Sequence, residues 1–125
     1  MDNQDFKKQL INRAFQLARR VIALVNKFPR SVAARIIATQ LLRAITSIGA
    51  NIIEAQAASS KRDFTNFLNH ALKSGNESKF WLALSKDLDK KLITEIDDLT
   101  GETDEIVKIL GSSISTLRGK RIVSN

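Results

Sequence analysis

Two stripes of polar side chains stand out in the sequence because their spacing places each stripe on one side of a helix. A helix advances about 100° per residue, so each stripe falls within an arc of about 80°. The first stripe consists of Gln40, Arg43, Ser47, Asn51 and Glu54, and the second of Asn66, His70, Ser74 and Glu77. Trp81, Leu84 and Leu88 continue the second arc, so both stripes are expected beside apolar side chains.

Polar side chains beside tryptophan and leucine are typical of a partly buried hydrogen-bonded network. Such a network fixes helix register or subunit pairing at some cost in stability. We expect Arg43 to pair with Glu77 or Glu54, and we interpret the stripes as structural. A ligand site is the alternative. The predicted network contains Arg43, Ser47, Asn51, Glu54, Ser74 and Glu77.

Other chemistry has little support in the residue types. The chain has no cysteine and one histidine, His70, which excludes disulfides, thiol nucleophiles and a Cys/His zinc site. There is no glycine-rich phosphate loop, the acidic stretch 95–105 lacks the alternating ligands of a calcium loop, and the Glu-x-x-His pattern of di-iron bundles is absent. We therefore predict no metal, no cofactor and no enzymatic activity.

The charge of the chain favours anionic partners. Twenty Lys and Arg against thirteen Asp and Glu give a net charge of +7. Positions 1–60 hold nine basic residues and three acidic ones. Arg13, Arg20 and Lys27 recur every seven residues and so lie close to one line, with Arg19 about 100° to one side. These four residues are the candidate contacts to nucleic-acid phosphates. The alternative is a solvated outer face.

Helices must position these residues, because one proline and five glycines leave few places to turn and no segment alternates with period two. Apolar stripes predict helices over about 5–27, 31–57, 61–89 and 95–118, followed by a basic tail, 119–125. Short connections then predict one all-α domain over 1–125, an antiparallel up-down-up-down four-helix bundle.

Local signals mark two of the helix starts. Ser60 with Asp63, and Thr94 with Asp97, have the spacing of an N-cap followed by an acid in the first turn. Gly101 and Gly111 cost about 1 kcal/mol each relative to alanine, so we expect the last helix to fray or to be placed differently from its predicted bounds.

The second predicted helix carries only three charged residues, Arg35, Arg43 and Glu54. A helix that is apolar nearly all round is buried in a large core or against other chains, and a chain of 125 residues has no large core. We therefore predict a homo-oligomer, with Leu42 and Ile53 pointing away from the intramolecular core. No fully apolar run approaches the roughly 18 residues of a spanning helix, so we expect a soluble, cytoplasmic protein without a membrane role.

The segment Leu41–Glu54, followed by Asp63, Phe64, Phe67, Leu68, Ala71, Leu72, Ser74 and Glu77, resembles a known family. It is similar to the bacterial four-helix bundle proteins encoded in intervening sequences of 23S ribosomal RNA genes, often labelled as a small-subunit ribosomal protein. Ala55 departs from the pattern, which usually has glycine there. The resemblance spans nearly the whole chain and is most specific in the second and third helices.

This resemblance implies an antiparallel bundle that assembles into a homo-oligomer, typically a pentameric barrel, with no established enzymatic activity. The chain also looks like the accessory protein of diversity-generating retroelements, a basic pentamer that contacts nucleic acid and a reverse transcriptase. The ribosomal label would reflect the location of the gene, so the resemblance by itself does not assign the chain to a ribosomal subunit.

Two functions remain open from the sequence. The first is non-enzymatic binding to the backbone of structured RNA or duplex DNA, because basic residues concentrate in the first two helices and would repeat around an oligomer. The second is a protein-interaction scaffold whose basic face serves solubility or an acidic partner. Binding that weakens steeply with salt would distinguish the first from the second.

Overall fold

The computed structural model describes residues 3–119, and within this range the chain forms four α-helices and no strand. The helices are α1 (Asn3–Val25), α2 (Val32–Gln56), α3 (Lys61–Ser85) and α4 (Ile93–Leu117), with a short 3-10 helix η1 (Lys90–Leu92) before α4. The expected basic tail, 119–125, lies outside the described residues apart from Gly119. The all-α prediction is confirmed.

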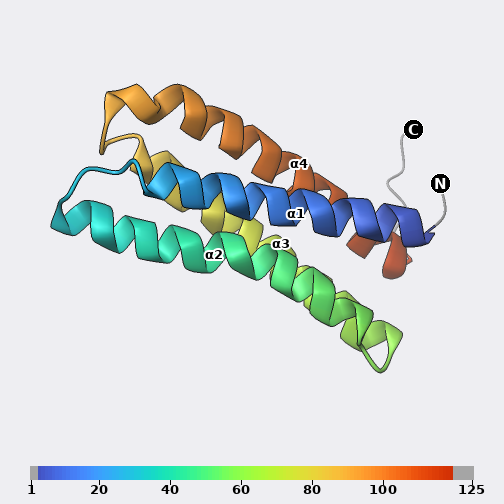
Figure 1. Cartoon of the computed structure of the whole chain (residues 1–125). Coiled ribbons are helices and arrows are strands. Elements are labelled where there is room, and N and C mark those ends of the chain that lie inside the picture. Colours follow the sequence, from blue (N-terminus) through green and yellow to red (C-terminus); the bar gives the residue numbers. More distant parts are fainter. Residues whose placement is uncertain (1–2, 120–125) are drawn as a thin grey trace.

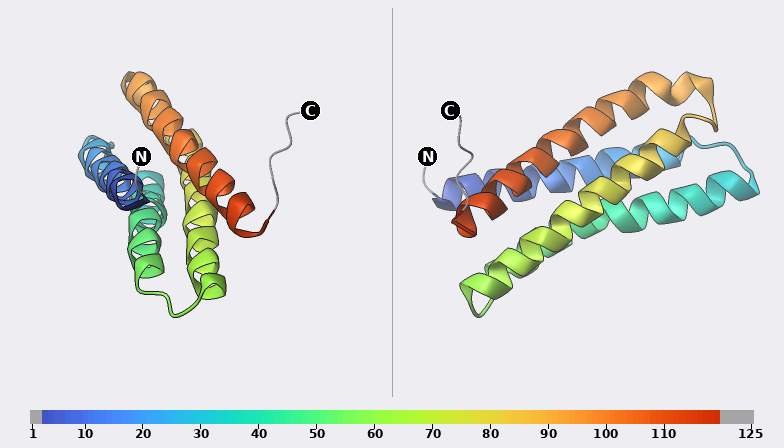
Figure 2. Two further views of the ribbon diagram at one scale, coloured as in Figure 1. Left: turned by 90° about the vertical axis from the view of Figure 1, so that its right-hand side faces the viewer. Right: turned by 180° about the vertical axis from the view of Figure 1, so that it is seen from behind.

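The four helices pack side by side around one core (Figure 1, Figure 2). We call the end at which α1 and α3 begin and α2 and α4 end the open end, because the α2–α3 hairpin slopes away from α1 there (Figure 1). The closed end carries the α1–α2 and α3–α4 connections.

The core is built mainly from branched side chains of α1, α2 and α4. In contrast, α3 contributes small residues to the core: Ala71, Gly75, Ser78 and Ser85 are buried, and Leu82 is its one large, fully buried side chain. Small side chains let neighbouring helices approach closely. The buried hydroxyls of Ser78 and Ser85 donate to the carbonyls of Ser74 and Trp81, both at 2.7 Å, so their polarity is satisfied inside the helix.

The starts of α2 and α3 are set by short polar side chains. Ser31 and Ser60 each accept a hydrogen bond from the backbone N–H three residues later, at 3.0 Å. Asp63 returns this interaction by accepting from the N–H of Ser59 at 3.3 Å. The Ser60–Asp63 prediction is therefore confirmed, and it explains why α3 begins at Lys61.

The expected cap at Thr94 is wrong, because the chain is already helical before it. Asp89 accepts from the N–H of Lys91 at 3.0 Å and caps η1, which leads directly into α4 at Ile93. Thr94 thus lies within the helix. The predicted third helix, 61–89, also ends earlier, at Ser85, since the backbone N–H groups of 86–88 bond three residues back.

The expected fraying of the last helix is also wrong, since α4 is continuous from Ile93 to Leu117. A β-carbon built on Gly111 would lie 3.6 Å from Leu72 Cδ1, which places this glycine against α3. Packing therefore outweighs the low helix propensity of glycine. The helix ends at Leu117, and Gly119 two residues later has a φ of +73°, the left-handed conformation common after a helix.

Candidate nucleic-acid interface

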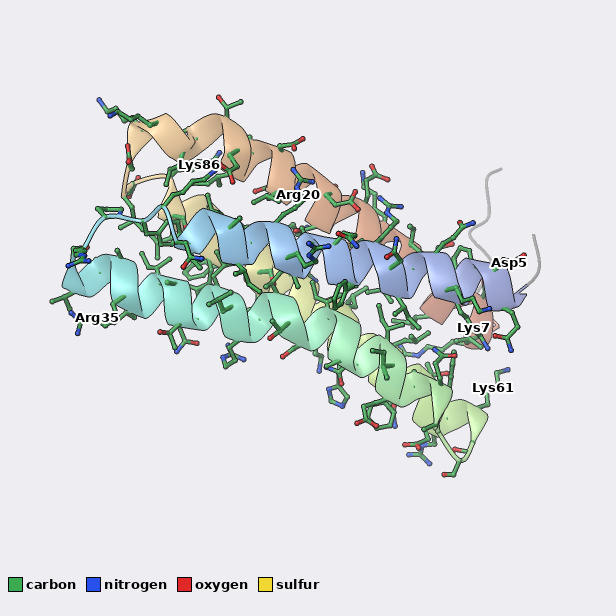
Figure 3. All side chains as sticks on the ribbon, viewed as in Figure 1. Asp5, Lys7, Arg20, Arg35, Lys61 and Lys86 are labelled. Atoms are coloured by element: carbon green, nitrogen blue, oxygen red, sulfur yellow. The ribbon has the colours of Figure 1, made fainter. Side chains whose placement is uncertain are left out.

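The predicted phosphate contacts on α1 are Arg13, Arg19, Arg20 and Lys27, which we call the ridge. Three of them, all but Arg19, pair with carboxylates of α4. Arg13 donates from Nε and Nη2 to both carboxylate oxygens of Glu102, at 2.9 and 2.7 Å. Arg20 pairs with Asp98, and Lys27 Nζ lies 2.8 Å from Glu95 Oε1. Figure 3 shows Arg20 on the side of α1 toward α4. We call these three ion pairs the α1–α4 rail.

Pairing changes what the ridge can do electrostatically. The hydrogen bonds that Arg13 donates to Glu102 raise the pKa of Arg13 above its ordinary value, so this guanidinium stays charged but its charge is already compensated. A phosphate would have to compete with a carboxylate for each cation of the rail. Arg19 is the exception among the four candidates, because within residues 3–119 it forms no ion pair and donates one hydrogen bond, to Gln16 at 3.3 Å, and it is exposed.

The predicted pairing of Arg43 with Glu77 is confirmed. Arg43 Nη2 bonds Glu77 Oε2, and the same oxygen accepts from Trp81 Nε1 at 2.9 Å. Arg43 Nε also donates to Gln40 at 3.1 Å. The Arg43 side chain is 54% exposed, so this pair joins α2 to α3 at the surface rather than in a buried site.

The other members of the predicted network bond locally. Ser47 Oγ donates to the carbonyl of Arg43 at 2.7 Å, and Asn51 Nδ2 donates to the carbonyl of Ser47 at 2.8 Å. Ser74 takes part through its carbonyl, which accepts from Ser78. Glu54 is exposed and forms no ion pair among residues 3–119. The stripe is therefore one interhelical contact followed by bonds within α2, and it does not form a closed network.

Positive charge without a carboxylate partner collects at the open end. A surface hollow of about 510 Å³ lies between the start of α3 and the end of α4. Its lining residues are Lys61, Arg62, Thr65, Asn66, Leu117 and Arg118. We call this the basic hollow. Figure 3 shows Lys61 and Lys7 at this end of the bundle, with Arg35 and Lys86 toward the other end.

A separate apolar cavity of about 570 Å³ opens beside the basic hollow, where all four helices meet at the open end. Its lining includes Phe6, Leu10, Ile52 and Phe64, and Leu117 lines both spaces. Lys7 stands at this cavity with Nζ 5.7 Å from the centre of the Phe64 ring, a cation–π contact.

Metal chemistry finds no support in this geometry. No three His, Cys, Asp or Glu side chains within residues 3–119 gather closely enough to hold a metal ion. His70, the one histidine, contacts the edge of the Phe67 ring with the ring centres 6.5 Å apart.

Comparison with known proteins places the fold in a family. The family described as 23S rRNA-intervening sequence protein matches residues 7–112, which is most of the chain. The chain belongs to this family. No match is found among curated proteins.

A solved structure of Bacteroides thetaiotaomicron VPI-5482, described as a protein with unknown function from the S23 ribosomal protein family, has the same fold. It is 33% identical, with a TM-score of 0.79, and the similarity covers 87% of this chain and 97% of that one. The resemblance seen in the sequence of the second and third helices is thereby confirmed for the 23S rRNA-intervening sequence family.

This family member exposes large apolar side chains in two separate areas. On α1, Phe15 and Ile22 are 61% and 46% exposed, and Ile53 on α2 is 56% exposed. Gly49, one turn before Ile53, faces Ala14 of α1, with 3.4 Å between a built β-carbon and Ala14 Cβ. Gly49 and Ala14 thus mark where α1 and α2 approach each other, with Ile53 one turn after Gly49 and Phe15 next to Ala14 in the sequence. We call Phe15, Ile22 and Ile53 the groove residues.

The second apolar area lies toward the closed end. Val32 and Ile36 are one turn apart at the start of α2, and Phe80 and Leu84 are one turn apart near the end of α3. We call these four the closed-end apolar residues. By length and composition α2 is the one described helix that could cross a membrane. The same composition is typical of a core helix, and eight residues of α2 are buried in the bundle.

Proposed function

We propose that this member of the 23S rRNA-intervening sequence family is a non-enzymatic, cytoplasmic, antiparallel up-down-up-down bundle that forms a homo-oligomer and binds the backbone of RNA or DNA. The proposed binding to nucleic acid rests on the Lys and Arg side chains that form no ion pair within the bundle. Residues 3–119 hold 18 of the 20 Lys and Arg, all but Lys120 and Arg121. Seven of the 18 form ion pairs and 11 do not.

The acidic side chains do not offset this surplus. The same range holds 12 of the 13 Asp and Glu, all but Asp2, and six of the 12 are already engaged in the ion pairs. Eleven unpaired cations thus stand against six unpaired carboxylates. Unpaired surface cations can neutralise phosphates, and this releases the counterions that are condensed on the nucleic acid.

The proposed antiparallel topology is supported by the order of the rail contacts. Moving forward along α1, from Arg13 to Lys27, the partners move backward along α4, from Glu102 to Glu95. The connections of a few residues at 26–31 and 57–60 favour the same arrangement for consecutive helices.

The proposed oligomer is supported by the two apolar areas. They occupy different faces of one chain, so the groove residues of one copy can contact the closed-end apolar residues of the next. A head-to-tail contact of this kind closes into a ring when its rotation divides a full turn. A pentamer, the assembly implied by the family resemblance, is the ring that we propose.

The nucleic-acid proposal is tested by the salt dependence of binding. We would measure fluorescence anisotropy of a labelled 30-base-pair DNA duplex and of a labelled RNA hairpin with the intact protein. If six or more phosphates are neutralised, affinity should fall by orders of magnitude between roughly 50 and 200 mM salt. Absence of binding to both probes at 50 mM salt would reject the proposal.

A protein-interaction scaffold is the second candidate, and the exposed apolar residues favour it. A partner such as the reverse transcriptase implied by the resemblance would cover Phe15 or Phe80, whose side chains are about 60% exposed. Apolar contacts respond weakly to salt, so a protein partner that binds equally well at 50 and 500 mM salt, together with no binding to either nucleic acid, would support this function instead.

A further inference from the structure

We propose that the basic hollow at the open end is the phosphate-contacting site of this protein, and that it takes the sugar-phosphate backbone of a nucleic acid. This inference rests on the nucleic-acid function proposed above and gives it a location. The site is formed by Lys61 and Arg62 at the start of α3 and Arg118 at the end of α4.

The three cations converge from two helices on one concave surface. Arg118 stands far from Arg62 in the sequence, and only the packing of α4 against α3 brings both to the same hollow. No ion pair within residues 3–119 involves Lys61, Arg62 or Arg118. Their charge is therefore free for an outside anion, in contrast to the rail.

No carboxylate among the described residues lines the basic hollow, so none competes there with a bound phosphate. The nearest acid in the sequence, Asp63, does not line the hollow. Its carboxylate is held by the N–H of Ser59 in the α2–α3 connection. Like-charged cations gathered without a counter-charge repel one another, and a bound phosphate relieves that repulsion.

The side chains of the basic hollow favour phosphate over other anions. Two guanidinium groups and one ammonium group suit phosphate oxygens, since guanidinium donates two parallel hydrogen bonds. The exposed amide of Asn66 adds donors, whereas the Thr65 hydroxyl is spent on the carbonyl of Lys61 at 2.8 Å. Leu117 supplies an apolar surface for a sugar.

The hollow favours a polymer over a small phosphate because it is shallow and its cations are solvent-exposed. Each exposed contact is weak, so tight binding requires several phosphates along one backbone. In the proposed oligomer the hollows repeat, and the second contact becomes intramolecular, with an effective concentration set by their spacing.

The experiment compares two triple variants of equal charge. The test variant carries Lys61→Gln, Arg62→Gln and Arg118→Gln. The matched control carries Arg30→Gln, Lys90→Gln and Lys91→Gln, which removes three unpaired cations at the closed end. Affinity for the 30-base-pair duplex is measured by anisotropy from 50 to 300 mM salt, with circular dichroism and light scattering on every sample.

We expect the test variant to bind at least tenfold more weakly at 100 mM salt, and the slope of log affinity against log salt to decrease by about 3 for each engaged subunit. The control should keep the slope of the parent. If the test triple does not fold or assemble, the single variants Arg62→Gln and Arg118→Gln replace it, each with an expected slope change of about 1.

If the test and control triple variants lose the same duplex affinity, both losses reflect net charge alone. That result would overturn the proposed location and leave the nucleic-acid function in place. A parent protein that binds neither duplex nor hairpin would overturn the function and the location together. A test triple that binds like the parent would overturn the location.

Discussion

Gly75 of α3 and Val107 of α4 lie so close that a β-carbon built on Gly75 would stand 2.5 Å from Val107 Cγ2. No real β-carbon tolerates that distance, and valine has a stiff side chain that moves little. Ile48 of α2 lies on the same glycine, with its Cδ1 at 3.8 Å. The absence of a side chain at Gly75 therefore sets how closely α3 approaches α4.

The substitution Gly75→Ala should destabilise the fold. Overpacking a well-filled core costs about 1 to 3 kcal/mol. Alanine gains about 1 kcal/mol of helix propensity over glycine, so the overpacking cost is the larger of the two over most of its range. Chemical denaturation followed by circular dichroism measures the difference. Adding Val107→Ala should recover much of the loss, because it removes the atom that clashes.

The control for this prediction is a second helical glycine. Gly101 is exposed and has nothing within 4 Å of a built β-carbon. Gly101→Ala should therefore stabilise the protein by about 1 kcal/mol through propensity alone. If both alanine variants stabilise to the same extent, the close approach at Gly75 is not what limits that position.

The Glu77 side chain should contribute more to the stability of the fold than its partner Arg43, because Oε2 of Glu77 also accepts a hydrogen bond from Trp81. Exposed ion pairs are worth about 0 to 1 kcal/mol, so Arg43→Ala should lower stability only slightly. Glu77→Ala additionally leaves the indole N–H without this acceptor. We expect Glu77→Ala to be the more destabilising of the two, with the double variant close to Glu77→Ala.

Fluorescence separates these variants, since Trp81 is the single tryptophan of the chain. Glu77→Ala should shift its emission, and Arg43→Ala should leave it nearly unchanged. If the two variants keep the stability of the parent and lose nucleic-acid binding instead, the stripe is a ligand site, which was the alternative drawn from the sequence.

Features that depend on short-range sequence patterns, such as helix bounds, could be predicted from the sequence. Apolar spacing predicted each helix to within four residues of its observed ends, and the arc through Arg43 was enough to narrow its partner to Glu77 or Glu54. The rail was missed, although Glu95, Asp98 and Glu102 have the 3-4 spacing that places three acidic residues on one helix face. The convergence of Arg62 and Arg118 was out of reach, because it depends on how the ends of α3 and α4 are placed in three dimensions.

Acid should weaken the contact between α3 and α4 through Asp104. Its carboxylate accepts from Lys79 Nζ at 2.9 Å and lies 3.2 Å from Lys108 Nζ, and these hydrogen bonds lower the pKa of Asp104 below its ordinary value of 3.8. A lowered pKa in the folded state means that the unfolded chain binds the proton first. The stabilisation is complete above the ordinary pKa and is lost as the pH falls through the lowered one.

Thermal unfolding of the parent and Asp104→Asn between pH 2 and 7 tests this coupling. The variant should melt at a lower temperature than the parent at pH 7, and the two curves should converge as the pH drops below about 4. Asp87→Asn is the control, since Asp87 is exposed and forms no ion pair within residues 3–119. A constant difference between Asp104→Asn and the parent down to pH 2 would contradict the prediction.

The groove residues should hold copies of the chain together. Ile53→Asp places a charge on the α1–α2 face without entering the core, so we expect it to dissociate the oligomer while helical content stays largely intact. Light scattering reports the mass and circular dichroism the helicity. Thr39→Asp is the control, an exposed position on the same helix. A parent protein that scatters as a 13.9 kDa monomer at micromolar concentration would refute the oligomer itself.

Charge exchange across the rail distinguishes a structural row of ion pairs from a nucleic-acid surface. Arg13→Glu brings a carboxylate against Glu102, so like charges meet where a bidentate pair stood, and stability should fall. Glu102→Arg alone should do the same by opposing two guanidinium groups. Combining both reverses the pair and restores the attraction, so the double variant should recover stability, although each pair at the surface is worth at most about 1 kcal/mol.

The same three proteins measure whether Arg13 contacts phosphate. The double variant keeps the net charge of the parent and moves one cation from α1 to α4, so a phosphate contact at Arg13 would be altered while the total charge stays constant. We expect the salt dependence of duplex binding to match that of the parent, because the guanidinium is engaged by a carboxylate in either arrangement. Arg19→Gln, which removes the one ridge cation without a carboxylate partner, should reduce the slope by no more than about 1. A double variant that regains full stability and still loses duplex binding would return the phosphate contact to α1.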